Sequence, residues 1–369
     1  MKVLLTGAHG FLGWHTHTRL RALTSHEVMP VGRDEMARID ELLAGADAVI
    51  HIAGVNRGSE DEVETGNIEL ARALARPLEA APVRVVYANS VQANAEHPGS
   101  DTPYGRGKEA AARILEGAVG PENLVDVRLP NLFGEHGRPG YNSFVATFAD
   151  AVARDQAPTE VKDNKIRLLH AQQAAQVLID GLEGEGRVER PRGTETSVVE
   201  VLNLLQRFRT TYLTGELPDL SNPFHAALFN TLRSHLFPQQ VPIALKLNSD
   251  QRGWLVETVR SQGGESQTFV STTYPGITRG EHFHLHKLER FVVLSGQARI
   301  SLRRTFHDEV VDFQVSGDEP VVVDMPTLWV HNITNTGDTE LITQFWTNTM
   351  FDPDNPDTFW EPVRQEDCG

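Results

Sequence analysis

The segment TGAHGFLG, residues 6–13, constrains the fold of this chain more than any other feature. It follows a short apolar run over residues 3–5 and precedes a stretch over residues 11–23 in which apolar residues recur at helical spacing. This order predicts a buried strand, a glycine-rich turn and a helix. Gly7, Gly10 and Gly13 would let the backbone approach a pyrophosphate group at the helix N-terminus, where free amide groups can bind it.

The same alternation of strand and helix continues to about residue 240. Further apolar runs lie at residues 28–31, 47–52, 83–88 and 124–129, with helical stretches between them. This pattern predicts an α/β domain built on a Rossmann-type, doubly wound parallel sheet. Helices are expected again over residues 142–154 and 171–182.

The pattern changes after a passage over residues 217–240 that contains three prolines and that we interpret as loop-rich. From residue 253 onward, short runs rich in Val, Ile, Thr and Phe follow one another without helices between them. Such a sequence predicts an all-β sandwich or small barrel. We therefore expect a nucleotide-binding domain over residues 1–242 and an all-β domain over residues 243–369.

The net charge and the cysteine content of the chain limit which partners it can bind and in which cellular compartment it is expected. The 369 residues include 50 acidic and 34 basic ones, and the net charge of -16 opposes broad contact with nucleic acid or an anionic membrane surface. The single cysteine, Cys368, excludes an internal disulfide and a thiolate metal cluster. Neither an export signal nor an apolar stretch of about 18 residues is present. We expect a cytoplasmic protein without nucleic-acid or membrane partners.

Residues after the second expected strand bear on the choice of cofactor. Gly32 and Arg33 occupy the place where an NAD enzyme usually carries an acid for the ribose 2′-hydroxyl. Arg33 could instead pair with a 2′-phosphate, which favours NADPH, or it could be an ordinary surface arginine. The residues that we expect to bind the cofactor are Gly7, Gly10, Phe11, Leu12, Gly13, Arg33, Ala53, Gly54, Tyr104, Lys108 and Asn131.

Tyr104 and Lys108 lie four residues apart, so both side chains share one face of a helix. A nearby ammonium would lower the pKa of Tyr104, and its hydroxyl could protonate a carbonyl oxygen while a nicotinamide delivers hydride to carbon. Ser90 ends the preceding strand. Residues 1–240 resemble the extended short-chain dehydrogenase/reductase superfamily, which implies Ser90, Tyr104 and Lys108 as the catalytic set. Many relatives carry the catalytic hydroxyl one residue later, where this chain has Val91. Either Ser90 or a neighbouring residue could therefore supply that hydroxyl.

The segment PGITRGEHFHLHKLERFVVLSG, residues 275–296, resembles the first motif of cupins. His282 and His284 are two apart on an expected strand and so point the same way, while Glu289 returns from the next strand. The segment MPTLWVHNITN, residues 325–335, resembles the second cupin motif and implies His331 as the fourth ligand. This set suits a divalent metal, with Zn²⁺ preferred, in a jelly-roll barrel. The alternative is a metal-free cupin that uses its histidines as hydrogen-bonding or base residues.

Both halves together resemble the CapF family of bifunctional capsular polysaccharide enzymes over nearly the full length. The matching segments are HIAGVNR at 51–57, RLPNLFG at 128–134, RPGYNSFVATF at 138–148, PGITRGEHFH at 275–284 and FDPDNPDTFW at 351–360. The resemblance implies that the cupin epimerises a UDP-2-acetamido-2,6-dideoxy-4-hexulose at C3. It also implies NADPH-dependent reduction at C4 to UDP-2-acetamido-2,6-dideoxy-L-talose, a step toward UDP-N-acetyl-L-fucosamine for capsule or O-antigen.

Chemistry sets the order of the two steps, because the C3 hydrogen is acidic only while C4 is a ketone. Reduction must therefore come last. The base could be His286, Lys287 or Asp324, and Arg138, Tyr141 and Asn142 are polar groups able to contact the sugar diphosphate. Because cupins commonly pair, we expect a homodimer. Two alternatives stay open, a nucleotide-sugar 4-reductase with a purely structural cupin and a non-catalytic NADP sensor.

Overall fold

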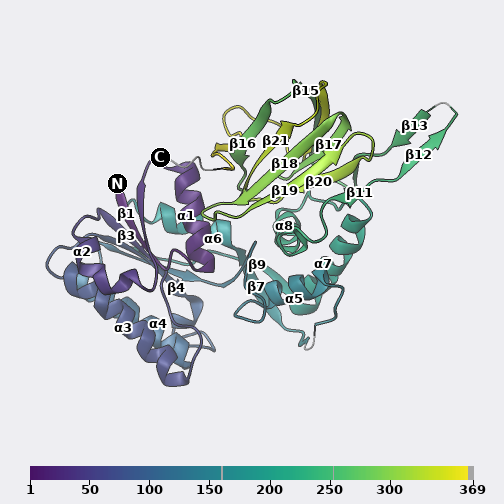
Figure 1. The fold of residues 1–369 in the computed structure, drawn as a ribbon. Coiled ribbons are helices and arrows are strands. Elements are labelled where there is room, and N and C mark those ends of the chain that lie inside the picture. The colour runs from purple at the N-terminus through teal and green to yellow at the C-terminus, as the bar shows by residue number, and fades with distance from the viewer. Residues whose placement is uncertain (159–160, 252, 365–369) are drawn as a thin grey trace. The chain divides into compact units, whose positions relative to one another are not determined.

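A computed structural model describes residues 1–158, 161–251 and 253–364 of the chain (Figure 1). The chain divides into two compact units, each made of two segments: Met1–Phe133 with Lys165–Thr196, and Gly134–Asn164 with Ser197–Gly369. Residues 197–242 thus belong to the same compact unit as the C-terminal strands. The expected domain boundary at residue 242 stays a prediction. Cys368 lies outside the described residues. Within the described ranges, no helix has the length and apolar character that a membrane span requires.

The first unit is built on a six-stranded parallel sheet with the order β2-β1-β3-β4-β5-β8. Its strands are β1 Lys2–Thr6, β2 Glu27–Val31, β3 Ala48–His51, β4 Arg84–Ser90, β5 Leu124–Leu129 and β8 Arg187–Glu189. The predicted Rossmann-like sheet is confirmed. The chain moves from β1 to β2 in one direction and to β3 in the other, so the strand order reverses at β1. In open α/β sheets a ligand binds at the carboxyl ends of the strands beside such a switch point.

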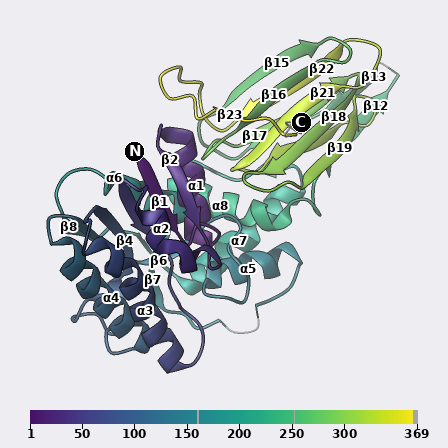
Figure 2. The same cartoon turned by 60° about the vertical axis from the view of Figure 1, so that its left-hand side comes forward.

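Helices cover both faces of this sheet. Figures 1 and 2 show α1 (Phe11–Leu23) beside α6 (Ala171–Asp180) on one face, and α3 (Glu60–Leu78) beside α4 (Pro103–Val119) on the other. The remaining elements are η1 Glu35–Arg38, α2 Ile39–Leu43, η2 Val91–Ala93 and a small sheet of β6 Asn131–Phe133, β7 Lys165–His170 and β9 Thr194–Ser197.

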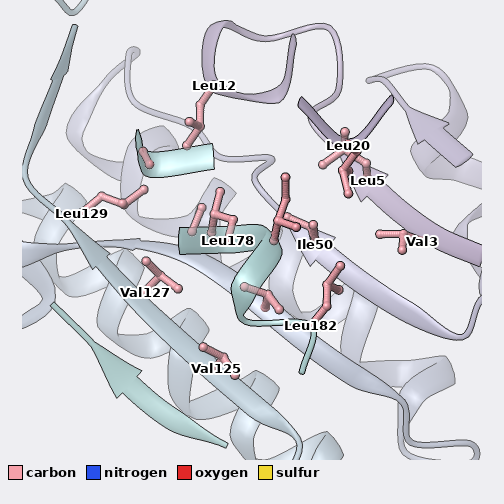
Figure 3. Close-up of a cluster of buried hydrophobic side chains, with 14 of the residues drawn as sticks. Val3, Leu5, Leu12, Leu20, Ile50, Val125, Val127, Leu129, Leu178 and Leu182 are labelled. Carbon is pink, nitrogen blue, oxygen red and sulfur yellow. The ribbon is translucent and has the colours of Figure 1, made fainter. Parts of the chain in front are cut away.

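Apolar strands are buried on both faces because each face packs against helices. Val3 and Leu5 of β1 belong to the cluster in Figure 3, together with Leu20 of α1 and Leu178 of α6. Leu4, between them, points to the opposite face and packs in the cluster beneath α3 and α4. Strands covered on both sides read as continuous apolar runs, which is why residues 3–5 were recognisable in the sequence.

The second unit begins with helices that pack on one another: α5 Phe144–Ala153, α7 Val198–Leu213 and α8 Pro223–Leu236. The interpretation of residues 217–240 as loop-rich was wrong, because α8 occupies most of that passage. The proline that suggested a loop is the first residue of α8. The side chain of Asn222 caps the helix by accepting hydrogen bonds from the amides of Phe224 and His225 at 2.9 and 3.4 Å.

The rest of the second unit, residues 243–364, is a C-terminal β region made mainly of two five-stranded antiparallel sheets, which confirms the all-β expectation. One sheet contains β11 Ile243–Ala244, β20 Val321–Met325, β17 Glu289–Ser295, β22 Leu341–Thr347 and β15 Gln267–Thr273. The other contains β19 Val310–Ser316, β18 Gln297–Arg304, β21 Trp329–Asn335, β16 Thr278–Phe283 and β23 Phe359–Trp360. Short pairs are formed by β12 Leu247–Asp250 with β13 Gly253–Val256 and by β10 Glu216–Leu217 with β14 Arg260–Ser261.

The two large sheets share one apolar core, to which the segment after α8 also contributes. Phe291 of β17 and Ile300 of β18 lie in the same buried cluster as Phe237. The Phe237 ring centroid is 4.7 Å from that of Trp329, and Arg233 of α8 donates a 2.7 Å hydrogen bond to the Met325 carbonyl. The C-terminal β region therefore depends on residues that precede position 243.

Candidate cofactor site and metal centre

The glycine-rich turn joins β1 to α1 at the sheet's switch point. Gly7 has a φ of 70°, and a Cβ there would lie 2.7 Å from the Ala53 amide nitrogen. A Cβ on Gly13 would lie 2.0 Å from the Gly7 carbonyl oxygen. Neither position accepts a side chain. Because α1 begins after Gly10, which has no side chain to cap it, its first amides are available to an anion such as a pyrophosphate.

Two side chains of opposite charge, Arg33 and Glu35, follow the end of β2. Arg33 is exposed, and its predicted contact with a 2′-phosphate stays a prediction. Glu35 folds back so that its Oε2 accepts a 2.8 Å hydrogen bond from the Gly32 amide. Sequence reasoning missed this carboxylate because it expected an acid immediately after the strand, whereas Glu35 arrives three residues later.

Five other predicted cofactor residues lie near the switch point or on the next small sheet. Phe11 and Leu12 form the first turn of α1, and Ala53 and Gly54 follow β3. The amide of Ala53 donates a 3.3 Å hydrogen bond to the Thr6 hydroxyl, which ties the end of β3 to β1. Asn131 is exposed on β6.

The predicted catalytic residues lie around the carboxyl end of β4. Ser90 is buried there, and its amide donates a 2.8 Å hydrogen bond to the Asn89 side chain. Tyr104 and Lys108 are one turn apart near the start of α4. The Nζ of Lys108 donates a 2.7 Å hydrogen bond to the Ala88 carbonyl, so α4 is anchored two residues before Ser90.

Burial dominates the titration of these groups. It lowers the pKa of Lys108 to about 7, while the charge of Asp126 acts in the opposite direction. Burial also raises the pKa of Tyr104, so the expected lowering by Lys108 was wrong. The Tyr104 hydroxyl consequently keeps its proton at neutral pH, the state that a proton donor requires.

A buried polar network below Ser90 was not predicted. Asn89 donates a 2.7 Å hydrogen bond to one oxygen of Asp126, and Arg128 donates a 2.8 Å hydrogen bond to the other. The three residues come from β4 and β5, which are neighbours in space but not in sequence. The sequence signal for this network was an acid, Asp126, within the otherwise largely apolar run of β5, and such a signal does not identify the partners of the acid.

The candidate substrate residues Arg138, Tyr141 and Asn142 belong to the second unit, in the loop before α5. All three are exposed, and the guanidinium carbon of Arg138 lies 5.4 Å from the Tyr141 ring centroid. Their predicted contact with a sugar diphosphate stays a prediction.

The four predicted metal ligands converge within the C-terminal β region. His282 lies near the end of β16 and His284 directly follows that strand, Glu289 begins β17 and His331 lies on β21. One ligand atom from each of them lies within 4.8 Å of the others. The Nε2 atoms of His282, His284 and His331 are 3.7, 3.1 and 3.3 Å from Glu289 Oε2.

Hydrogen bonds on the far side of two rings show that this cluster fits a cation. The Nδ1 atoms of His284 and His331 lie 2.5 and 3.1 Å from the carbonyls of Asp357 and Trp329, which can only accept. In a neutral ring, each Nε2 then presents a lone pair toward the Glu289 carboxylate. Among the described residues, the buried His284 Nε2 has no hydrogen-bond partner despite the nearby oxygen. Converging imidazole lone pairs and a carboxylate are donors that Zn²⁺ and similar ions prefer.

The charge states of the cluster favour the same interpretation. Burial acts to raise the pKa of Glu289, but the charge of His284 and hydrogen bonds from the histidines, both of which act when the rings are protonated, outweigh it, and the pKa falls well below its usual range. Burial lowers the pKa of His331 to about 4. An ionised carboxylate and a neutral imidazole are the forms that bind metals.

The three candidate bases differ in accessibility. Asp324 is fully buried and held by Arg290, so it is unsuited to proton transfer. Lys287 is buried and donates to the Pro356 carbonyl, whereas His286 is exposed on the loop between β16 and β17.

Sequence and structure comparisons identify relatives of both halves. Residues 3–183 match the NAD dependent epimerase/dehydratase family, which implies a nicotinamide cofactor, and residues 248–359 match the polysaccharide biosynthesis C-terminal domain. A UDP-2-acetamido-2,6-beta-L-arabino-hexul-4-ose reductase of Pseudomonas aeruginosa is 31% identical over 372 residues, covering 97% of this chain and 98% of that protein. A probable low-salt glycan biosynthesis epimerase of Haloferax volcanii is 28% identical over 124 residues, covering 31% of this chain and 80% of its own length. The crystal structure of the capsular polysaccharide assembling protein CapF from Staphylococcus aureus superposes with a TM-score of 0.60 at 30% identity, covering 98% and 100% of the two chains.

Proposed function

Because this chain belongs to the CapF family, we propose that it converts a UDP-2-acetamido-2,6-dideoxy-4-hexulose into UDP-2-acetamido-2,6-dideoxy-L-talose in two steps. The C-terminal β region, as a cupin, epimerises C3, and the N-terminal domain then reduces C4 with NADPH. One observation carries the proposal: a chain that matches a hexulose reductase over nearly its whole length has both a glycine turn with Tyr104 and Lys108 and a separate metal-ligand cluster.

In the reductive step, Tyr104 would donate its phenolic proton to the C4 oxygen of the sugar. The bound nicotinamide supplies the hydride that C4 receives. Lys108 lies one turn away and, when charged, stabilises the phenolate that proton donation leaves behind. Ser90 would hold the same oxygen through its hydroxyl. Arg33 would receive the 2′-phosphate that distinguishes NADPH.

In the epimerising step, a side chain removes the C3 proton while C4 is still a ketone, and a proton returns on the opposite face. His282, His284, Glu289 and His331 would hold a divalent ion, with Zn²⁺ preferred. Such an ion supplies Lewis acidity toward a carbonyl oxygen. His286 and Lys287 remain candidate bases, and Lys287 would have to release the Pro356 carbonyl first.

Three side chains of the second unit would position the substrate. Arg138 offers a cation to the diphosphate, and Tyr141 and Asn142 add an aromatic surface and an amide beside it. A bidentate guanidinium pair is enough to bind a phosphate group strongly.

Deuterium incorporation tests the two steps separately. The metal-loaded protein is incubated in D₂O with a UDP-2-acetamido-2,6-dideoxy-4-hexulose, and NMR follows C3 with and without NADPH. We expect exchange at C3 without NADPH, and the talose product only with it. Consumption of NADPH without any exchange would leave a 4-reductase with a structural cupin.

Matched variants separate the sites. Tyr104→Phe should retain NADPH binding and C3 exchange but lose about 10²–10⁴-fold in reduction, whereas a non-catalytic NADP sensor would show no reduction even in the wild type. Glu289→Gln should lose exchange. Tyr274→Phe, which changes an exposed tyrosine, is the control and should leave both reactions unchanged.

We further propose that the enzyme works in the cytoplasm, where NADPH and UDP-sugars are made, and that it forms a homodimer. Large apolar side chains exposed on β12 and β13, Leu247, Trp254 and Leu255, are consistent with a covered surface in an assembly. Light scattering on the purified protein measures the oligomeric state.

A further inference from the structure

The segment FDPDNPDTFW, residues 351–360, supplies none of the four expected metal ligands, yet Asp357 contacts the loop that carries them. Its Oδ1 accepts a 2.9 Å hydrogen bond from the Leu285 amide. Its Oδ2 accepts hydrogen bonds of 2.9 and 2.7 Å from the amides of His286 and Lys287. One carboxylate thus binds three consecutive backbone amides.

These amides lie between two of the ligands. The bound loop begins at His284 and leads directly to Glu289 at the start of β17. Hydrogen bonds from amides to a charged carboxylate are shorter and stronger than neutral ones. Asp357 therefore sets the path of the backbone between an imidazole ligand and a carboxylate ligand.

The main chain of Asp357 also acts on His284 directly. Its carbonyl oxygen lies 2.5 Å from His284 Nδ1 and can only accept, so the proton must reside on Nδ1. Nε2 is then the free nitrogen, and it points toward the cluster, 3.1 Å from Glu289 Oε2. A bond of this kind fixes both the tautomer and the orientation of a metal-binding ring.

Contacts on either side hold Asp357 in place. On the preceding side, the Lys287 ammonium donates a 2.5 Å hydrogen bond to the Pro356 carbonyl. On the following side, β23 pairs with β16, with Phe359 opposite Phe283 and Trp360 opposite His282. The φ of Asp357 is 43°, a conformation that side-chain-bearing residues adopt only when their surroundings stabilise it.

We propose that Asp357 is a positioning residue of the metal centre: its carboxylate shapes the loop between His284 and Glu289, and its carbonyl selects the metal-binding tautomer of His284. This inference rests on the proposed metal centre. It assigns a role to a residue that lies 73 positions after His284 and is not one of the four ligands.

Zinc affinity of the full-length protein tests the proposal, measured by competition with a chromophoric chelator. Asp357→Asn keeps the size of the side chain and the backbone carbonyl but removes the charge and one acceptor oxygen. We expect zinc binding to weaken by about 10–100-fold, the range for lost outer-shell partners. Asp357→Glu restores the charge and should recover part of the affinity. Asp354→Asn, an exposed residue of the same segment, is the charge-matched control and should bind zinc as the wild type does.

A thermal readout distinguishes positioning from a merely structural role. Zinc should raise the Tm of the wild type and of Asp354→Asn more than that of Asp357→Asn. Equal zinc affinity in the wild type and Asp357→Asn, with Tm lowered alike in the apo and zinc-loaded forms, would overturn the proposal. Absence of zinc binding by the wild type would instead overturn the metal centre itself, and with it this inference.

Discussion

Arg290 and Asp324 lie opposite each other on β17 and β20 and form a bidentate ion pair from which solvent is fully excluded. Their hydrogen bonds measure 2.8 and 2.9 Å, and neither side chain has exposed surface. Arg290 also donates a 2.8 Å hydrogen bond to the Gly215 carbonyl. The charge of Asp324 is thereby committed to the structure of the second unit, which explains why it is unsuited to act as the epimerisation base.

Removing one partner of this pair should be costly, because the other charge stays buried. We expect Asp324→Asn to lower the free energy of unfolding by about 3–5 kcal/mol, measured by urea denaturation. Glu41→Gln breaks the exposed pair with Arg38 and should leave the midpoint unchanged, since solvent screens that pair. Equal midpoints for the two variants would contradict the argument.

The Asp126 carboxylate should control the pH profile of reduction through Lys108. Lys108 is protonated below its pKa of about 7, and Asp126 favours this charged form. Asp126→Asn should lower that pKa further, so the ammonium is lost at a lower pH. We expect the alkaline limb of the kcat/KM profile to move toward lower pH, with activity partly recovered on acidification.

Glu109→Gln serves as the control for this shift. Glu109 also pairs with Arg128, at 3.6 Å, but it is not among the groups that act on Lys108. Its pH profile should coincide with that of the wild type. A profile unchanged in Asp126→Asn would show that the charge of Lys108 does not limit the reaction.

Cofactor preference should depend on the opposing charges at the end of β2. Arg33→Ala should raise the KM for NADPH by about 10–100-fold and leave the KM for NADH nearly unchanged, because a charged hydrogen bond contributes about 1.5–3 kcal/mol. Glu35→Gln should act in the opposite sense and favour NADPH, since it removes a carboxylate bound to the Gly32 amide. Steady-state kinetics with both cofactors measure the ratio, and equal effects on both would refute the assignment of Arg33.

Phe237 should stabilise the C-terminal β region although it precedes it in the sequence. Its ring centroid lies 4.7 Å from that of Trp329 and 5.9 Å from that of Phe313, and its side chain is buried in the shared core. Phe237→Ala should cost about 3–5 kcal/mol in chemical denaturation. Phe351→Ala, at a position that is 62% exposed, should have little effect.

Local patterns were enough to predict the parallel sheet of the first unit. The spacing of apolar residues identified α1 with its observed bounds, and the apolar runs identified strands that are buried on both faces. The prediction for residues 217–240 was wrong because Pro223 was interpreted as a loop signal, although proline suits the first turn of a helix. The contact of Glu35 with the Gly32 amide was also missed. It forms over one short turn, and the pattern of apolar residues in a strand does not predict such a turn.

The sequence by itself determined the parallel sheet and the glycine turn, because each depends on local periodicity or on short spacing. It also identified the residues that converge in the β region, because the segments that carry them resemble the two cupin motifs. Only the tertiary structure decided which charges are neutralised and which side chains hold the site in place. Asp126, Asp324 and Asp357 are all acids in or beside strands, yet one lies below Lys108, one is paired with Arg290 and one binds the loop after His284. Strand pairing and loop packing bring residues far apart in the sequence into contact, and those contacts set the charge state and orientation of each group.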